Sequence, residues 1–450
     1  MPAAGVLLTD LYELTMLQAY HAERMEGVAV FELFVRKLPA QRRFLVAAGL
    51  AQAVDYLLGL RFDDGDCEHL VRDRGFDPGF VASLRDLRFT GDLDAIPEGT
   101  IVFPDEPLVR VTAPLREAQL VESRLLNLLH FQTIVASKAV RCVLAAPGKR
   151  LVDFGMRRAH GAEAALLSAR ASYLAGFAAT ATVEAGRAFG IPVAGTMAHS
   201  YVQAHRDERS AFAAFARAHP RNAVLLIDTY DTRRGAAIAA DVAKAMAREG
   251  IAIRGVRIDS GDLAGHAFAV RAILDAAGLR GVTIFASGNL DEFAVRDIEA
   301  RGAPVDGYGI GTRMNTSADA PYLDCAYKLQ AYEGVAKRKR SEGKATWPGV
   351  KQVLRRRDAG GVLAGDVVAL AADPIGEGVP LLEPVIRAGR LLRPLPALHA
   401  SRERLATELA QLPAAYRSLD GSAPPPVTIA PSIRALAARI DAATSGTAAG

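Results

Sequence analysis

Six short apolar runs in the middle of the chain each end in a cluster of polar residues. In order, they read RLVDF, GIPVAG, AVLLID, GVRID, VTIFAS and VDGYGIG, all within residues 150–311. Alanine-rich stretches with helical spacing separate them, for example RRGAAIAADVAKAMAREG at residues 233–250. Strand, helix and strand repeated in this order predict parallel β/α units.

The polar clusters lie where each predicted strand ends. They read DFGMRR, GTMAHS, DTYDT, RIDSGDL, SGN and GIGTR. In a barrel of parallel strands, the active site is built at the carboxyl ends of the strands. Packing alone does not explain six consecutive strand ends rich in Asp, Arg, Ser, Thr and Gly. The sequence therefore predicts an α/β barrel with a catalytic face, over residues 120–321.

The flanking regions have a different pattern. Residues 1–119 contain strand-like pieces such as VAVFELFV and PLVRVTAP, which indicate an antiparallel, mixed α+β layer. A long helix, apolar on most sides, is predicted at residues 116–140. Residues 322–440 again contain strand and turn patterns and are expected to return to the N-terminal layer. Residues 441–450 are expected to be a disordered tail.

Composition limits the classes of partner. The formal net charge is +4, and aromatic residues make up 6% of the 450 residues. A small anionic substrate explains this mild charge as well as nucleic acid does. The basic run KRKRSEGK at 337–344 is better explained as a solvated strand or turn. Three separated cysteines favour a reducing cytoplasm, and neither a signal peptide nor an apolar run of membrane-spanning length is expected.

Two histidines lie in VAGTMAHSYVQAH, residues 193–205, among only nine in the chain. A single histidine is more often a surface or core residue than a functional one. His199, however, comes where a predicted strand gives way to a loop, beside the other strand-end clusters. His205 falls six positions later in a predicted helix and is expected to have no role in the chemistry.

The segment GVRIDSGDLAGH is the most informative strand end. Asp259, Ser260 and Asp262 crowd a glycine turn directly after the apolar run. Two carboxylates at such a place suit either ribose hydroxyls or a divalent cation, because both prefer hard oxygen acceptors. Arg257 can bind a carboxylate or phosphate through two hydrogen bonds. Helix capping explains one of these residues but not the whole set.

Two glycine turns are candidate phosphate sites. They are ASGNLDEF at 286–293 and GYGIGTRM at 307–314, which end the last two predicted barrel strands. Phosphate sites of this architecture are frequently found there. DFGMRRAHG adds a cationic cluster of Arg157, Arg158 and His160 beside Phe154. Together these features predict a ligand with more than one phosphate, a ribose and an anionic planar partner.

Ten blocks of this chain resemble nicotinate phosphoribosyltransferase, a type II phosphoribosyltransferase. In chain order they read LLTDLYELTM, FELFVRKLP, NLLHFQT, DFGMRRAHG, GTMAHSYV, IDTYDT, GVRIDSGDL, ASGNLDE, DGYGIGT and KRSEGKATWPGVKQV. The resemblance implies transfer of phosphoribose from 5-phosphoribosyl 1-pyrophosphate (PRPP) to nicotinate, in NAD salvage, giving nicotinate mononucleotide and pyrophosphate. It also implies an irregular α/β barrel joined to an open-faced α+β sandwich, which the N- and C-terminal parts form together.

The resemblance implies roles for individual residues. His199 matches the family's phosphorylated histidine, and Tyr12 and Phe154 match the aromatic pair that sandwiches the pyridine ring. Arg157 or Arg158, with Arg257, is implied to face the nicotinate carboxylate and PRPP, and Thr196 is grouped with the nicotinate site. Asp259 resembles the acid that holds the ribose hydroxyls. The implied phosphate-binding residues are Ser260, Gly288, Asn289, Gly311 and Thr312.

The implied partners are nicotinate, PRPP and ATP, with Mg²⁺ bound to PRPP and ATP. Coupling to ATP hydrolysis would proceed through phosphohistidine at His199, and a homodimer would form its active sites at the interface. The chemistry agrees, because an aromatic nitrogen nucleophile needs no strong general base, and no Ser-His-Asp or Cys-His arrangement is present. No metal ligand among the side chains, no nucleic acid and no membrane partner are expected.

The sequence departs from the family pattern at two places. ATAT at 179–182 replaces the GTSN of many relatives, and His130 replaces a common Asn. Three alternatives stay open at this point. A nicotinamide phosphoribosyltransferase would need an acid where Ala181 stands, and a barrel aldolase or phosphosugar isomerase would need a Lys or Glu at a strand end. An RNA-binding protein would need a basic face with interleaved aromatics, but Trp347 is the sole Trp.

Overall fold

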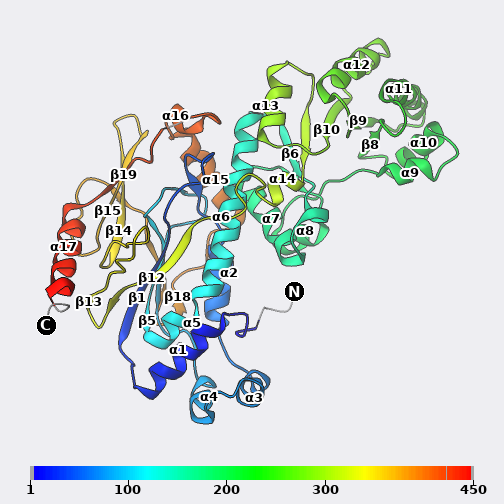
Figure 1. The fold of residues 1–450 in the computed structure, drawn as a ribbon. Coiled ribbons are helices and arrows are strands. Elements are labelled where there is room, and N and C mark those ends of the chain that lie inside the picture. Colours follow the sequence, from blue (N-terminus) through cyan, green and yellow to red (C-terminus); the bar gives the residue numbers. More distant parts are fainter. Residues whose placement is uncertain (1–4, 422, 447–450) are drawn as a thin grey trace. The chain divides into compact units, whose positions relative to one another are not determined.

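The computed structural model describes residues 5–421 and 423–446, and the chain separates into two compact units. One unit holds the residues up to Ile134 together with those from Tyr322 onward, and the other holds Val135–Pro321 (Figure 1). We call them the flanking unit and the central unit. The first division falls inside helix α6 (Glu122–Ala145), whereas the sequence analysis expected the barrel to begin at residue 120. The helical pattern continues through the division, so no turn signal marks it.

The central unit is built on a six-stranded parallel sheet. Its strands, in spatial order, are β7 (Ala179–Thr180), β6 (Arg150–Asp153), β11 (Gly307–Ile310), β10 (Thr283–Ser287), β9 (Ile253–Ile258) and β8 (Ala223–Leu226). Every adjacent pair is parallel. The predicted parallel α/β architecture is therefore confirmed, and the carboxyl ends of all six strands lie along one edge of the sheet.

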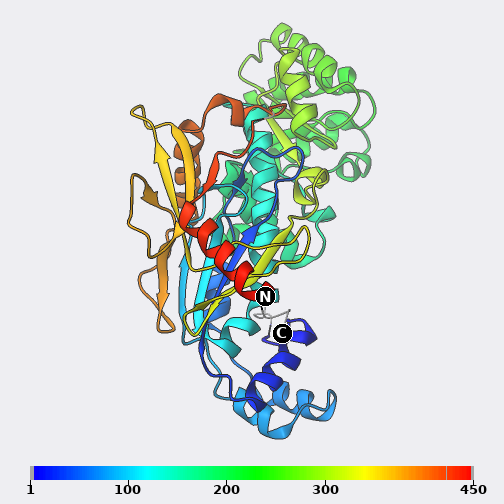
Figure 2. The ribbon, with the colours of Figure 1, turned by 60° about the vertical axis from the view of Figure 1, so that its left-hand side comes forward.

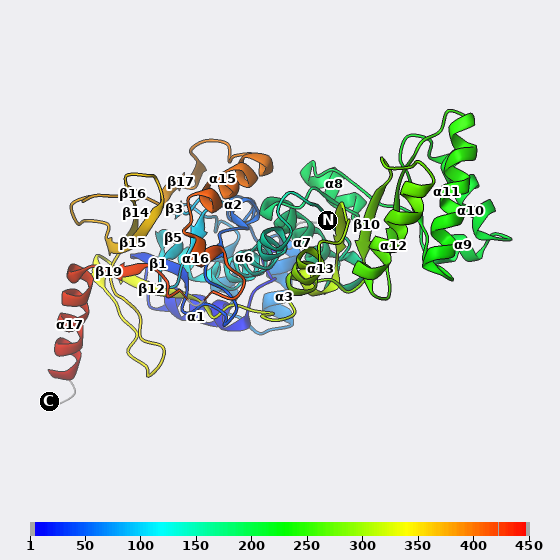
Figure 3. The ribbon, with the colours of Figure 1, turned by 90° about the horizontal axis from the view of Figure 1, so that it is seen from above.

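Helices connect these strands. They are α7 (Ala162–Ala175), α8 (Val183–Phe189), α9 (His199–Gln203), α10 (Glu208–Ala218), α11 (Thr232–Arg248), α12 (Leu263–Ala276), α13 (Glu292–Ala300) and α14 (Thr312–Asn315). Aspartates Asp207, Asp231 and Asp291 cap the N-termini of α10, α11 and α13 through their side chains, as expected for acids directly before helices. In Figure 3, α10, α11 and α12 lie side by side.

Two expectations about this sheet were wrong. Among the described residues, β7 and β8 form its outer edges and do not pair with each other, so the sheet is a half-barrel. GIPVAG at 190–195 forms only an isolated parallel bridge between Val193 and Thr180. Strand β7 comes instead from ATAT, inside a stretch interpreted as helical. Alanine favours helices, but Gly176 ends α7 with a φ of 122°, and the chain after it is extended.

Strands from both ends of the chain share one sheet in the flanking unit. Its order is β13 (Val335–Ala336), β12 (Cys325–Tyr332), β1 (Val28–Val35), β5 (Pro107–Pro114), β3 (Asp92–Ala95), β17 (Glu383–Arg387) and β18 (Arg390–Leu391). The C-terminal strands β12 and β17 pair antiparallel with β1 and β3. The segment after Tyr322 thus returns to the N-terminal layer.

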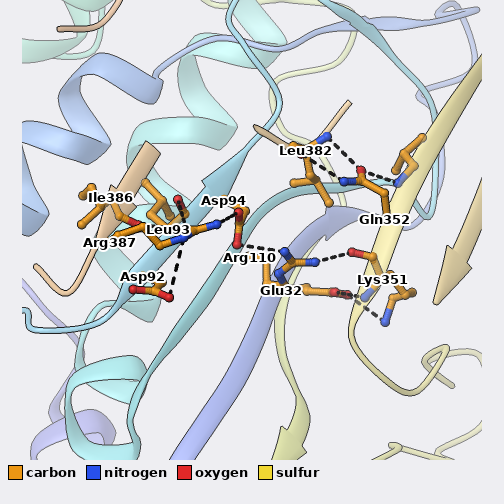
Figure 4. Close-up of polar contacts among 11 residues, drawn as sticks. Glu32, Asp92, Leu93, Asp94, Arg110, Lys351, Gln352, Leu382, Ile386 and Arg387 are labelled. Carbon is orange, nitrogen blue, oxygen red and sulfur yellow. Dashed lines mark hydrogen bonds and ion pairs between the residues drawn. The ribbon is translucent and has the colours of Figure 1, made fainter. Parts of the chain in front are cut away.

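Ion pairs and a hydrogen bond to a backbone carbonyl connect strands of this sheet with one another and with Lys351 (Figure 4). Lys351 lies 2.7 Å from Glu32 Oε2, and both side chains are almost fully buried. Arg110 Nη1 donates to the Lys351 carbonyl at 2.6 Å, and its Nη2 donates to Asp94 at 2.8 Å. Arg387 donates to the other oxygen of Asp94 at 2.5 Å. These contacts join the C-terminal Lys351 and Arg387 to N-terminal strands.

A second sheet in the flanking unit has the order β16 (Val379–Pro380), β14 (Lys351–Arg357), β15 (Leu363–Leu370) and β19 (Val427–Ile429). Helix α17 (Pro431–Gly446) packs against β15 (Figure 2). The expected disordered tail at 441–450 is therefore wrong for 441–446, which continue α17, because alanine-rich sequence extends the helix. The expectation for residues 447–450 lies outside the described residues.

The remaining elements of the flanking unit are short. They are α1 (Leu11–Ala22), α2 (Leu50–Leu58), α3 (Asp64–Arg72), α4 (Pro78–Leu84), α5 (Leu115–Leu120), α15 (Leu398–Ala410), α16 (Ala414–Arg417) and the two-stranded sheet of β2 (Leu45–Val46) and β4 (Ile101–Val102).

The predicted long helix is two helices, α5 and α6, divided at Val121. Contrary to expectation, α6 is long and apolar enough to cross a membrane, but 78% of its most apolar window is buried, as in a core helix.

Candidate active site

The strand ends of the central unit bring the predicted polar clusters together. Strand pairing aligns Ser287 with Gly309 and Ile310 with Asp153, and Leu226 with Arg257. The residues that follow these positions therefore lie next to one another along the carboxyl edge of the sheet. Active sites of parallel α/β proteins are built at this edge.

Two carboxylates form the centre of the site. Asp228 Oδ2 accepts hydrogen bonds from the Asp259 backbone N–H at 2.7 Å and from Ser260 Oγ at 2.8 Å. Asp228 Oδ1 is buried and has no hydrogen-bond partner among the described residues. Asp259 Oδ1 accepts a hydrogen bond from Ser287 Oγ. Each carboxylate is held by one oxygen, which leaves an oxygen of Asp228 available to a ligand.

Asp228 was missed as a site residue. It lies directly after β8 and Ile227, in the cluster DTYDT, and this strand-end position was the available signal. Ser287, at the end of β10, was likewise not selected, although it belongs to the cluster SGN. Both residues hold Asp259 or its neighbours in place rather than forming a recognisable motif of their own.

His199 lies beside Asp259 and Thr229. Its Nε2 lies 3.9 Å from Asp259 Oδ2, and its Nδ1 lies 3.2 Å from Thr229 Oγ1. The imidazole side chain is 40% exposed, so a ligand can reach it. His199 is the first residue of the five-residue helix α9, rather than part of a loop after a strand. The bridge at Val193 is too short to form the expected strand.

His205 makes a different set of contacts. Its Nδ1 donates to the Tyr201 carbonyl at 2.8 Å, and its ring lies 4.5 Å from the Tyr201 ring. It follows α9 rather than lying within a helix. These contacts explain His205 as a local structural residue.

Arg257 lies beside Phe154. The guanidinium carbon is 5.8 Å from the centre of the Phe154 ring, and Nη1 donates to Thr196 Oγ1 at 2.8 Å. Arg257 Nε is buried without a hydrogen-bond partner among the described residues. Burial lowers the pKa of Arg257, and the nearby Asp259 opposes that effect, so the guanidinium stays charged at neutral pH. A charged fork beside an aromatic ring suits a flat carboxylate ligand.

The turn after β6 is held by the buried Asp153. Asp153 Oδ1 accepts hydrogen bonds from the Gly155 N–H at 2.8 Å and from Asn315 Nδ2 at 3.0 Å. Its Oδ2 accepts from Thr180 Oγ1 at 2.8 Å. Burial raises the pKa of Asp153, and these three hydrogen bonds act in the opposite direction. The network fixes the backbone on both sides of Phe154, and the sequence analysis did not identify it.

Arg157 and Arg158 lie in the short 3₁₀ helix Met156–Arg158, and both are exposed. Arg157 is close enough to Arg257 to lower the pKa of Arg257 further. The positive charges of Arg157, Arg158 and Arg257 favour an anionic ligand. The nearby His160 is also exposed.

The predicted phosphate turns are close to the other strand ends. A Cβ at Gly288, whose φ is 108°, would lie 2.1 Å from the Asp259 carbonyl oxygen. A Cβ at Gly311 would lie 2.9 Å from the Phe154 carbonyl oxygen. Asn289 adopts a φ of 51°, a conformation that Asn tolerates better than most residues. Glycine at 288 and 311 thus permits the close backbone approach that brings these turns to the site, and Thr312 begins the helix after the second turn.

Tyr12 lies in the flanking unit, near the start of α1, and is 43% exposed. The structure does not place it relative to Phe154, so the stacking pair stays a prediction. The departures at ATAT and His130 have no structural explanation, and Thr180 is common to ATAT and GTSN. Thr180 of ATAT supports Asp153, and His130 lies in α6, where burial lowers its pKa.

The fold and these strand ends define the class: an α/β protein with a charged site at the carboxyl edge of a parallel sheet. The model of the nicotinate phosphoribosyltransferase N-terminal domain matches residues 7–130, and that of the nicotinate phosphoribosyltransferase family matches residues 149–347. The chain belongs to the nicotinate phosphoribosyltransferase family.

Named relatives agree with this membership. The chain is 49% identical to nicotinate phosphoribosyltransferase pncB2 of Mycobacterium tuberculosis, over 92% of this chain and 89% of that protein. It is 34% identical to the Bos taurus nicotinate phosphoribosyltransferase, over 98% and 97%. The crystal structure of human nicotinic acid phosphoribosyltransferase matches with a TM-score of 0.86 at 32% identity, over 95% of this chain and 99% of that one.

Proposed function

We propose that this chain transfers the phosphoribosyl group of PRPP to nicotinate, giving nicotinate mononucleotide and pyrophosphate, in NAD salvage. The observation that carries the proposal is the position of two pairs along the carboxyl edge of the parallel sheet. One pair is the carboxylates Asp228 and Asp259, and the other is Arg257 with Phe154. In a chain of this family, the first pair suits ribose and the second suits a pyridine carboxylate.

The transfer forms one bond and breaks one bond. The pyridine nitrogen of nicotinate attacks C1 of the ribose, and the bond from C1 to the pyrophosphate oxygen breaks with its electron pair. The nitrogen needs no deprotonation, so the transfer itself requires no general base. The chain contributes orientation: Arg257, with Arg157 or Arg158 and Thr196, holds the nicotinate carboxylate while Phe154 supports its ring.

The ribose and phosphate groups of PRPP have separate partners. Asp259 accepts hydrogen bonds from the ribose hydroxyls, while Asp228 holds its backbone N–H and Ser287 holds its carboxylate. The turns Gly288–Asn289 and Gly311–Thr312 offer backbone N–H groups to the 5′-phosphate. A dimer in the cytoplasm, with Tyr12 of the partner subunit against the second face of the pyridine ring, completes the proposal.

The site suits Mg²⁺ that arrives with PRPP. Asp228 Oδ1 is a buried carboxylate oxygen without a partner among the described residues, and carboxylate oxygens are preferred Mg²⁺ ligands. Asp228 and Asp259 would hold the ion, which stabilises the charge of the leaving pyrophosphate when bound.

ATP coupling is assigned to His199. Its Nε2 attacks the γ-phosphorus of ATP, ADP leaves, and water later releases the phosphate. Thr229 holds Nδ1, which leaves Nε2 directed at the Asp259 side of the site. His199→Ala should abolish labelling by γ-labelled ATP in an alkaline workup, while a slow ATP-independent transfer remains. Equal labelling of both proteins would remove His199 from the mechanism.

Product analysis tests the main proposal. The protein is incubated with PRPP, Mg²⁺ and either nicotinate or nicotinamide, with and without ATP. Nicotinate mononucleotide and pyrophosphate should form in equal amounts from nicotinate. Nicotinate should be preferred to nicotinamide, because no acid stands at Ala181 to bind the amide of nicotinamide. A product from nicotinamide alone would contradict the proposal.

A further inference from the structure

We infer that Arg313 and Asp291 form an ionic clamp that holds the two phosphate turns of this site at a fixed separation, making both of them positioning residues for the 5′-phosphate of PRPP. This inference rests on the proposed function, because it concerns the substrate of that same site. Neither residue belongs to the acids, the histidine or the aromatic ring described above.

One carboxylate connects the two turns. Asp291 Oδ1 accepts hydrogen bonds from the backbone N–H groups of Phe293 at 3.1 Å and Ala294 at 2.9 Å, which caps helix α13. Asp291 Oδ2 accepts from Arg313 Nη1 at 2.5 Å. Asp291 follows the Gly288–Asn289 turn by two residues, and Arg313 directly follows the Gly311–Thr312 turn. The clamp therefore fixes the residues that come after each turn.

The position of the pair distinguishes it from a surface ion pair. The Asp291 side chain is 11% exposed, and that of Arg313 is 44% exposed. A half-exposed guanidinium at a turn exchanges with water, but its partner is held by two backbone hydrogen bonds. The cap therefore holds Asp291 Oδ2 in a fixed position, at which it accepts the Arg313 hydrogen bond.

The start of α13 is anchored from the opposite side as well. Glu292 is fully buried and pairs with Arg141 at 2.8 Å and with Lys138 at 2.5 Å. Lys138 pairs in addition with Asp319 at 2.8 Å. These contacts come from α6 and from the segment after α14, so α13 begins at a point fixed on several sides. Such fixing is the condition for backbone N–H groups to bind phosphate without reorganisation.

The clamp also removes an electrostatic obstacle. An isolated aspartate two residues beyond a phosphate turn would repel the phosphate dianion. The cap hydrogen bond from Ala294 and the Arg313 guanidinium outweigh burial and hold the pKa of Asp291 below its usual range, so the carboxylate is ionised. Arg313 balances that charge. Removing Arg313 should therefore loosen the second turn and also expose the phosphate to an unbalanced carboxylate.

Kinetics with variants test the clamp. Arg313→Ala should raise the KM for PRPP about tenfold, with kcat and the KM for nicotinate within about twofold of the parent, as expected for loss of one charge-assisted contact. Arg313→Lys keeps the charge without the planar fork and should give an intermediate KM. Arg217→Ala, which removes an exposed two-bond pair with Glu249 in the same unit, is the matched control and should change nothing.

A double variant separates positioning from direct contact. If Arg313 acts through Asp291, then Arg313→Ala combined with Asp291→Asn should be no worse than Arg313→Ala alone, because the unbalanced charge is gone and Asn still caps a helix. Additive losses in the KM for PRPP would show that Arg313 acts independently of Asp291 and would overturn the clamp.

A binding readout separates this inference from the proposed function. Calorimetry with ribose 5-phosphate should show a similar loss of affinity in Arg313→Ala and no loss in Arg217→Ala. If the parent binds ribose 5-phosphate through the clamp but forms no nicotinate mononucleotide, the proposed function fails and the clamp stands. If the parent is active but Arg313→Ala and Arg313→Lys keep full affinity for PRPP and ribose 5-phosphate, the clamp fails. The clamp also fails if the parent neither binds ribose 5-phosphate nor reacts.

Discussion

Two charged clusters, one in each unit, differ in how completely their groups are paired. In the flanking unit, Lys351 pairs with Glu32, and Asp94 receives a guanidinium on each oxygen, from Arg110 and Arg387 (Figure 4). In the central unit, Asp228 Oδ1 and Arg257 Nε are buried without partners among the described residues. Each carboxylate of the first cluster is ion-paired, whereas a carboxylate oxygen and a guanidinium nitrogen of the second are available to a ligand.

The difference has an energetic meaning. A buried charge with its partner present is tolerated, and losing one partner leaves an uncompensated charge that is costly. A buried polar atom without a partner already carries part of that cost in the folded chain, which a ligand can offset by bonding to it. We therefore expect the first cluster to determine stability and the second to determine binding. Four predictions test this comparison.

Lys351→Met should have the largest effect, on stability. Glu32 is fully buried and would lose its cation, so the free energy of unfolding should fall by about 3–5 kcal/mol. Denaturant unfolding measures this. The double variant Lys351→Met with Glu32→Gln should recover part of the loss, because no unpaired charge remains. A double variant as unstable as the single one would mean that packing, rather than charge, explains the effect.

Arg257→Ala should have the next largest effect, on nicotinate binding. A charge-assisted contact of this kind is worth about 2–4 kcal/mol, while the melting temperature should change less because the folded chain loses the hydrogen bond from Nη1 to the neutral Thr196 hydroxyl rather than an ion pair at hydrogen-bond distance. Steady-state kinetics and thermal unfolding measure the two quantities. Arg254→Ala is the control, since Arg254 is an exposed residue of the same strand. A large fall in melting temperature with unchanged turnover would assign Arg257 to the structure instead.

Glu13→Gln should remove a pH dependence of stability from the flanking unit. Burial raises the pKa of Glu13 to about 7 against its ordinary value of 4.5, although hydrogen bonds from Thr9 and Ser123 act the other way. Between these values the folded chain keeps a proton that the unfolded chain has lost. The free energy of unfolding should therefore fall as pH rises from about 4.5 to 7, by at most about 1.4 kcal/mol per pH unit.

Melting temperatures across that pH range measure the effect. The parent should lose stability faster with rising pH than Glu13→Gln does. The exposed Glu26, replaced by Gln, is the control and should leave the parent's slope unchanged. Parallel curves for the parent and Glu13→Gln would contradict the prediction.

Phe154→Leu should have the smallest effect, on nicotinate affinity. Stacking beyond the buried area is worth about 0.5–1.5 kcal/mol, and the leucine still supports one face of the ring. Phe268→Leu, on the exposed side of α12, is the control. If Tyr12 comes from the partner subunit, mixed dimers of Tyr12→Ala and Phe154→Ala chains should regain part of the activity. Mixed dimers without any recovery would argue for a site formed within one chain.

Strand-end position in the sequence identifies several residues that the fold brings together. His199 and Asp259 were selected from strand-end position, and the structure brings them to 3.9 Å. Arg257 and Thr196 were also selected, and they share a hydrogen bond. Asp228 and Asp153 were missed although they lie in the quoted clusters DTYDT and DFGMRR, because their roles depend on contacts with residues 31 and 162 positions away. Strand β7 was missed because ATAT has the composition of the helices on either side.

By itself, the sequence determined the alternation of strands and helices and the kind of side chain at each strand end. These properties are local, since apolar periodicity and glycine or proline breaks act over a few residues. Only the tertiary structure decided which strand ends are neighbours and, within residues 5–421 and 423–446, that the sheet stays open between β7 and β8 and which buried atoms lack partners. The order β7-β6-β11-β10-β9-β8 brings Asp228 beside Asp259, and Asp291 beside Arg313, across 31 and 22 residues of sequence. Contacts of that separation depend on the packing of the whole sheet, which no short stretch of sequence encodes.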